Sequence, residues 1–244
     1  MNYLVEIAAN SLASAQIAEQ AGADRIEFCS ALETGGLTPS YGQLRLLAER
    51  VTIPAHILIR VRPGHFCYDQ AEQAQMMLDI ALSQELGFAG VVVGALTRHG
   101  EIDMAFCQRV RDTVKHGKLV FHRAFDFCAQ PLAAAARLIE IGFDGVLSSG
   151  AAATAVQGLA QLKHCQQSYG QQLEFIAAAG IDANNASTIL RETGVSSLHA
   201  SASQLFASAD AHPGSLPGLT NDYRQTSLAS ATALVQAVRA YQPD

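Results

Sequence analysis

The sequence predicts one α/β domain, residues 1–244, folded as a closed (β/α)8 barrel, the TIM-barrel fold. Strand and helix patterns alternate strictly along the chain, which is typical of a parallel sheet. Eight such pairs fit into the 244 residues, and a closed barrel of this kind takes about 250 residues as one unit. The same local pattern also recurs at the start of several strands.

Four glycines mark this recurring pattern: Gly22, Gly87, Gly142 and Gly194. Each follows a helical pattern and precedes a short apolar run, such as Gly90-Val91-Val92-Val93. Glycine accepts the left-handed conformation that ends many helices. A short apolar run fits a strand buried on both faces, as in a parallel sheet.

The order of the elements follows from these boundaries. We expect strands at residues 3–7, 24–28, 55–60, 89–93, 118–122, 144–147, 173–177 and 196–199. We expect helices at residues 10–21, 40–50, 69–86, 103–115, 130–140, 153–168, 182–192 and 226–241. The first strand lacks a following glycine-rich dinucleotide fingerprint, which favours the closed barrel over an open sheet. A long loop, about residues 201–225, is expected to lie over the site face, because loops of this length are usually functional or disordered.

Composition excludes several classes of partner. The formal charge is −6 with no basic cluster, so a phosphate-tracking nucleic-acid surface is not expected. The longest uncharged stretch, residues 145–162, is too polar to span a membrane. The first residues have no basic segment typical of a secretory signal. Five cysteines without a CxxC pair are typical of free thiols, and we expect a cytoplasmic chain.

Charged residues occur within the expected strands. Arg25 and Glu27 alternate with the apolar residues Ile26 and Phe28, and Glu6 also lies between apolar neighbours. Alternate side chains of a strand point to opposite faces, and charges facing the helix layer would be costly. These three side chains should therefore point into the barrel.

Further polar groups lie where chemistry collects in barrels, at the carboxyl ends of the strands. Arg60 ends the third strand, and the fifth ends in His122-Arg123-Ala124-Phe125-Asp126. Two interpretations of these charged groups are open: they form structural ion pairs with one another, or they bind and act on an anionic substrate. His199, which ends the eighth predicted strand, fits a structural role or a role in the site. On the second interpretation, carboxylates and histidine transfer protons while arginines clamp the anion. The catalytic candidates are then Glu6, Glu27, His122 and Asp126, and the clamps Arg25, Arg60 and Arg123.

Three segments of small residues could hold an anion. They contain Ser149 and Gly150 after the sixth strand, Gly180 after the seventh, and Ser201 after the eighth. Loops after the last two strands of such barrels frequently bind phosphate through backbone N–H groups. Together these segments favour a small phosphorylated or carboxylated ligand.

The cysteines divide by position. Cys29, Cys67 and Cys128 belong to the loop face, whereas Cys107 and Cys165 lie on helices, where a buried and inert thiol is usual. Thiolates are soft ligands that select Cu(I), so a copper site at Cys29 and Cys67 is chemically sensible.

Four segments together resemble the CutC family of copper homeostasis proteins: residues 22–29, 35–40, 60–68 and 121–126. The resemblance implies a cytoplasmic TIM barrel that forms homo-oligomers, such as a dimer or a tetramer. It also implies Cu(I) as the bound metal, held by cysteines, and assigns this role to Cys29 and Cys67. Family members often carry cysteine after the first-strand glutamate, where this chain has Ala8 and Ala9.

Two functions therefore remain open. One is a CutC-type protein that binds Cu(I) at cysteines of the loop face. The other is a barrel enzyme that acts on a small anionic metabolite, such as a phosphorylated one. An arginine-rich pocket suits an anion better than it suits Cu(I), which prefers sulfur ligands.

Overall fold

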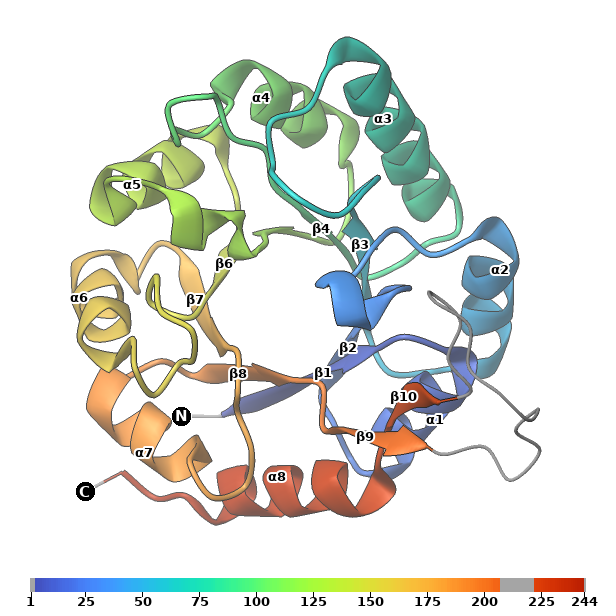
Figure 1. Ribbon diagram of the computed structural model, residues 1–244, viewed down its shortest axis with the longest axis vertical. Helices are drawn as coiled ribbons and strands as arrows, with labels where there is room; N and C mark the ends of the chain where they lie inside the picture. Colours follow the sequence, from blue (N-terminus) through green and yellow to red (C-terminus); the bar gives the residue numbers. More distant parts are fainter. Residues whose placement is uncertain (1–2, 207–221, 244) are drawn as a thin grey trace.

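In the computed structural model, residues 3–206 and 222–243 are described, and they form a closed barrel of parallel strands ringed by helices (Figure 1). The barrel strands are β1 Leu4–Ala9, β2 Arg25–Phe28, β3 Ala55–Ile59, β4 Gly90–Val93, β5 Lys118–Phe121, β6 Gly145–Ser148, β7 Glu174–Ala178 and β8 Ser197–Ala200. The α-helices of the described residues are α1 Leu12–Gln20, α2 Tyr41–Arg50, α3 Gln70–Glu85, α4 Met104–Thr113, α5 Pro131–Ile141, α6 Leu159–Tyr169, α7 Ala186–Thr193 and α8 Leu228–Ala240. The predicted (β/α)8 fold is confirmed.

The barrel closes because β8 pairs with β1 in parallel register. Glu6 of β1 lies opposite His199 of β8 and also opposite Arg25 of β2. Closure therefore places three charged or titratable side chains from the two ends of the chain in one row inside the barrel.

Two separate apolar clusters follow from strand alternation. The larger cluster lies between the strands and the helices and includes Ile26, Phe28, Ile57 and Phe121, all fully buried. The smaller cluster lies inside the barrel and consists of Cys29, Leu58, Val92, Val120, Leu147, Ile176 and Ala178. The remaining interior positions are largely polar, so burial of the apolar face of each strand forces the charged residues inward, as predicted.

Helix α6 begins later than the sequence predicts. The predicted helix started at residue 153, but Leu159 is the first helical residue. The alanine-rich segment before it turns back toward β7, where Ala155 N–H donates to the carbonyl of Ala179 at 3.0 Å. Gly150 and Gly158 permit this turn, since a Cβ on Gly150 would lie 2.2 Å from the Gly158 oxygen.

The predicted loop at residues 201–225 is partly a β-hairpin. Strand β9, Ser203–Phe206, pairs antiparallel with β10, Tyr223–Thr226, and residues 207–221 lie outside the described residues. The hairpin packs beside α1 at the barrel rim (Figure 1). Ser14 of α1 accepts a hydrogen bond from Thr226 N–H, and Asn10 donates one to the Arg224 carbonyl. The described ends of this segment therefore lie beside the barrel mouth.

Two short 3₁₀ helices complete the carboxyl-end face of the barrel. η1, Leu32–Thr34, follows β2, and η2, Arg123–Phe127, follows β5. Of the helices in the described residues, none has both the length and the apolar character needed to cross a membrane.

Candidate active site

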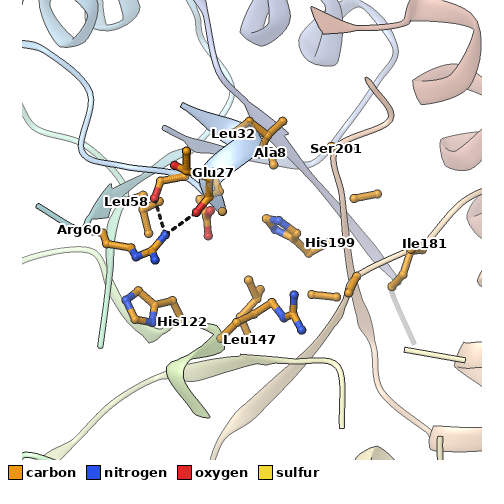
Figure 2. Close-up of a pocket in the computed structure, with 18 of the residues that line it drawn as sticks. Ala8, Glu27, Leu32, Leu58, Arg60, His122, Leu147, Ile181, His199 and Ser201 are labelled. Atoms are coloured by element: carbon orange, nitrogen blue, oxygen red, sulfur yellow. Dashed lines mark hydrogen bonds between the residues drawn. The ribbon is translucent and has the colours of Figure 1, made fainter. Parts of the chain in front are cut away.

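A pocket of about 390 Å³ opens at the carboxyl ends of the strands (Figure 2). Its walls include apolar side chains from the inner cluster, such as Leu58 and Leu147. Its polar side chains are Glu27 of β2, His199 of β8, Arg60 and His122 directly after β3 and β5, Thr34 of η1, Arg123 of η2 and Ser201 after β8, and Gly180 lines it after β7. An apolar cavity with a few convergent polar groups is the usual form of a small-molecule site.

A chain of ionic contacts supports the floor of this pocket. Glu174 accepts a hydrogen bond from Arg25 Nη2 at 3.0 Å, and Arg25 Nε donates to Glu6 Oε2 at 2.6 Å. The other oxygen of Glu6 lies 2.6 Å from His199 Nδ1. Glu6 and Arg25 thus act from beneath the pocket, where they orient His199.

The carboxyl groups at this site have opposite pKa shifts. Burial alone would raise the pKa of Glu6, but Arg25 and His199 hold it well below the ordinary value. Burial raises the pKa of Glu27 to about 6, and Glu6 adds to the rise while His199 opposes it. Burial disfavours a charged His199 ring, yet Glu27 and Glu6 together raise the pKa of this histidine. Divergent pKa values in one cleft are typical of paired proton donors and acceptors.

Arg60 is a buried cation whose contacts are to carbonyl oxygens. Its Nη1 donates to the carbonyls of Thr34 and Gly36, drawn as dashed lines in Figure 2, and its Nη2 donates to the Gly64 carbonyl. Its Nε has no hydrogen-bond partner, and within the part of the chain that the structure describes no carboxylate forms an ion pair with it. Arg60 therefore brings an uncompensated positive charge to the pocket.

His122 is a buried neutral histidine. Its Nδ1 accepts a hydrogen bond from Ala124 N–H at 3.1 Å, whereas its Nε2 has no hydrogen-bond partner in residues 3–206 and 222–243. Burial and the neighbouring Arg60 charge lower the pKa of His122 to about 3. Because Nδ1 is an acceptor, the neutral ring carries its proton on Nε2 and presents an unused N–H donor.

Asp126, Ser149 and Gly150 lie outside the pocket lining and form a structural network. Asp126 accepts hydrogen bonds from the Ser148 and Ser149 hydroxyls and from backbone N–H groups after β6. Gly150 N–H donates to the Ser148 hydroxyl at 2.9 Å. The predicted catalytic role of Asp126 and the predicted anion cradle at Ser149 and Gly150 are not what this geometry favours, because these groups already satisfy one another.

Arg123 connects this network to the pocket. Its Nε donates to Asp126 Oδ2 at 2.9 Å and its Nη2 to Ser149 Oγ at 2.9 Å, while its partly exposed side chain lines the pocket mouth. Across the mouth, Ala179 and Gly180 both have positive φ, at 78° and 68°. Such a conformation is unusual for alanine and is found mainly at functional sites.

The two cysteines assigned to copper lie in different surroundings. Cys29 is fully buried in the inner apolar cluster, and burial together with the nearby carboxylates raises the pKa of its thiol well above the ordinary range. Cys67 is half-buried beside His65 and Arg98 in a second surface hollow, and its Sγ donates to the Thr97 carbonyl at 3.2 Å. Among the described residues, no cysteine lines the main pocket.

Glu6, Glu27 and His199 are the donors in the described residues that come closest to a metal site, with ligand atoms within 4.8 Å of one another. Both oxygens of Glu6, however, are already engaged by Arg25 and His199. A guanidinium bonded to one of the three donors opposes the binding of a cation. The two carboxylates of this set are hard ligands and do not suit Cu(I).

His199 is the residue whose role the sequence left undecided. Its position in β8, opposite Glu6 in the register, places it in the pocket wall. In the sequence, His199 was placed at the end of the eighth predicted strand, which left its role open. Phe66, which sequence reasoning did not select, contacts both His122 and Arg60, with 5.0 Å between the Phe66 and His122 ring centroids and 5.1 Å from Arg60 Cζ to the Phe66 centroid.

Fold and site together define a TIM-barrel protein with an ionic pocket at the carboxyl ends of its strands. A sequence model described as the CutC family matches residues 3–204, and the chain belongs to this family. CutC of Salmonella agona is 43% identical over 205 residues, which cover 84% of this chain and 82% of that protein. CutC of Pasteurella multocida is 38% identical over 197 residues, or 81% of each chain.

Solved structures agree with this assignment. A copper homeostasis protein CutC from Streptococcus agalactiae superposes with a TM-score of 0.77 at 29% identity, covering 82% of this chain and 98% of that one. A phosphoribosylanthranilate isomerase from Thermotoga maritima superposes with a TM-score of 0.59 at 10% identity, over 98% of this chain and all of that one. The second likeness concerns the barrel fold alone.

Proposed function

We propose that this chain is an enzyme that acts on a small anionic metabolite bound in the barrel pocket. The observation that carries the proposal is a set of three buried polar atoms without partners in the described residues: Glu27 Oε2, Arg60 Nε and His122 Nε2. All three residues line the same pocket. Buried polar atoms are nearly always hydrogen-bonded, and a ligand would satisfy these three together.

The charge of the ligand follows from Arg60. A buried guanidinium without a carboxylate partner among the described residues is costly, and an anion in the pocket would compensate it. Arg123 lines the same pocket, and although its Nε is paired with Asp126, its partly exposed guanidinium can also meet an anion. The positive-φ turn at Gly180 and the hydroxyl of Ser201 belong to the loops that commonly bind phosphate in barrels.

Proton transfer is assigned to Glu27 and His199. A carboxyl group with a pKa of about 6 is mostly ionised at neutral pH yet still basic enough to accept a proton, as a general base requires. His199 is held by Glu6 through Nδ1 and is stabilised in its charged form, so it can return a proton as a general acid.

A ligand screen tests this function. Small carboxylates and phosphorylated metabolites are added one at a time, and the melting temperature of the wild type is compared with that of Arg60→Lys and Arg98→Gln. We expect stabilisation by a subset of anions, reduced by about tenfold in apparent affinity in Arg60→Lys. Arg98 lies outside the pocket lining, so Arg98→Gln should respond as the wild type does. An absence of any stabilising anion, or equal responses in all three proteins, contradicts the proposal.

Cu(I) binding at Cys29 and Cys67 is the second candidate function. It is favoured by the description of the Streptococcus agalactiae relative as a copper homeostasis protein. The burial of Cys29 and the separate hollow of Cys67 do not form a shared thiol site, so two-cysteine coordination requires the loops to rearrange. An anaerobic Cu(I) titration against a competing chelator decides it: binding must be tight in the wild type and lost in Cys29→Ser/Cys67→Ser.

The remaining parts of the proposal are location and assembly. A cytoplasmic location is consistent with five free cysteines. Homo-oligomer formation, as a dimer or a tetramer, rests on the family resemblance and is tested by light scattering of the purified protein.

A further inference from the structure

We infer that His122 and Arg60 form an oxyanion subsite and that the pocket catalyses enolisation, the removal of a proton from a carbon next to a carbonyl group. The inference rests on the proposed function and specifies its reaction. The substrate class is a small anionic carbonyl compound whose carbonyl oxygen meets the Nε2–H of His122 and the Nε–H of Arg60. Glu27 is the base.

The first support is the tautomer of His122. Its Nδ1 is occupied by Ala124 N–H, so the ring can present only an Nε2–H donor to the pocket. The ring packs against the side chain of Phe66 and occupies the space beside Gly94 where a Cβ would fall, 2.6 Å from His122 Nδ1. The donor is therefore fixed in place before any ligand binds.

The second support is the position of Arg60 beside this histidine. Both side chains contact the same Phe66 ring, and both lie on one side of the pocket in Figure 2. Three carbonyl contacts hold the two terminal nitrogens of Arg60, and its Nε forms no hydrogen bond of good geometry within the described part of the chain. The subsite thus offers two preorganised N–H groups, one neutral and one charged.

The third support is the position of Glu27 in the same pocket as the donors of His122 and Arg60. Glu27 lines the same pocket from β2, and its Oε2 is buried without a partner among the described residues. Figure 2 shows the Glu27 side chain between Arg60 on one side and His199 on the other. A ligand carbonyl that reaches the two donors would place its adjacent carbon near the Glu27 carboxylate.

The step balances without an external reactant. The C–H bond next to the carbonyl breaks, its proton passes to Glu27 Oε2, and its electron pair forms the C=C bond while the carbonyl π electrons become the oxyanion. The oxyanion is then held by the Nε2–H of His122 and the Nε–H of Arg60. Return of a proton from Glu27 or His199 to a carbon of the enolate completes an isomerisation or an epimerisation.

A neutral histidine suits this task. The pKa of His122, lowered to about 3 by burial and by Arg60, keeps the ring uncharged at every physiological pH. Preorganised donors aimed at a developing negative charge contribute most when they do not need to reorganise during the reaction. Triosephosphate isomerase pairs a glutamate base with a neutral histidine in the same way.

The test is imidazole ¹⁵N NMR with oxalate, a planar dianion that resembles an enediolate. We expect His122 to remain a neutral Nε2–H tautomer between about pH 5 and pH 8. We expect its Nε2–H resonance to shift when oxalate binds. His122→Leu should weaken oxalate binding by about tenfold to a hundredfold, and His122→Gln, which keeps a donor, should restore part of the affinity. Circular dichroism identifies a variant that fails to fold.

Three results overturn the inference: an ordinary titration of His122, an Nδ1–H tautomer, or a resonance that oxalate does not move. None of these results by itself contradicts the proposed function. Stabilisation by anions that depends on Arg60 could still be found in the ligand screen. If the screen itself finds no anion, the proposed function fails and the enolisation step fails with it.

Discussion

His199 Nδ1 lies 2.6 Å from Glu6 Oε1, a contact that joins the last strand of the barrel to the first. The other oxygen of Glu6 accepts from Arg25, so one buried carboxylate supports both a histidine of the pocket wall and a guanidinium below it. This contact fixes the orientation of the imidazole and favours its charged form.

Replacement of Glu6 by glutamine should therefore affect stability and titration together. In Glu6→Gln, Arg25 keeps Glu174 as its partner but loses its shorter ion pair. We expect the free energy of unfolding to fall by about 3 kcal/mol, as is usual when one partner of a buried pair is removed. We expect the pKa of His199 to fall, because Glu6 is one of the two carboxylates that raise it. Urea denaturation measures the stability and NMR titration measures the pKa of His199. Unchanged values of both would contradict the role of Glu6 as the shared partner of His199 and Arg25.

Glu27 should make the protein less stable as the pH rises. Its folded pKa of about 6 exceeds the ordinary value of 4.5, so the folded state binds this proton more tightly than the unfolded chain does. The stabilisation is complete below about pH 4.5 and is lost as the pH passes through about 6. Glutamine does not ionise, so Glu27→Gln does not lose this stabilisation. We expect its free energy of unfolding to rise by about 2 kcal/mol relative to that of the wild type between pH 4.5 and 7.

The measurement is the difference in the free energy of unfolding between Glu27→Gln and the wild type across this range. Glu33→Gln is a matched control, since Glu33 is exposed near the pocket mouth. A difference that does not change with pH, or an equal change in Glu33→Gln, would show that burial does not perturb Glu27.

Asp126 should prove structural. Asp126→Ala removes the acceptor for the Ser148 hydroxyl, the Ser149 hydroxyl and two backbone N–H groups. Because these donors lose a charged partner together, we expect the free energy of unfolding to fall by about 2–4 kcal/mol. Chemical denaturation measures this loss. A variant of wild-type stability that has lost only ligand binding would restore Asp126 to a direct role in the site.

Gly94 tests the placement of His122 without changing the histidine. In Gly94→Ala the new Cβ would lie 2.6 Å from both Cε1 and Nδ1 of the ring, so the ring must move. We expect oxalate affinity to fall by about tenfold, because one of the two donors leaves its position. Gly42→Ala is the control, since nothing lies within 4 Å of a Cβ there. Wild-type oxalate binding in Gly94→Ala would show that His122 does not hold the ligand.

Sequence periodicity was sufficient for the barrel because strand alternation and helix-ending glycines are local signals. It also placed Glu6, Arg25 and Glu27 inward, since a charge facing the helix layer is costly. The sequence did not predict which charged groups pair with one another and which remain free to bind a ligand. Asp126 follows a strand as catalytic groups do, but the serines that engage it come from the next strand. Only the three-dimensional packing decides which polar groups are satisfied and which remain free.

Helix α6 and the cysteines illustrate the same limit. The alanine-rich segment before α6 has high helix propensity, yet a tertiary hydrogen bond from Ala155 to Ala179 bends it away from a helix. Cys29 and Cys67 both belong to the loop face in sequence, yet Cys29 packs inside the barrel and Cys67 lines a separate hollow. Spacing along the chain does not show whether two thiols share one cavity.

Proton-linked calorimetry of oxalate binding tests the central claim most directly. Oxalate is titrated at pH 7 into the wild type and into Glu27→Gln, in two buffers that differ in ionisation enthalpy. An anion beside Glu27 raises the pKa of this carboxyl group further, so binding to the wild type should take up a proton, approaching about one per site. Glu27→Gln should take up none. Absence of binding, or equal proton uptake by the two proteins, would contradict an anion site next to a proton-accepting Glu27.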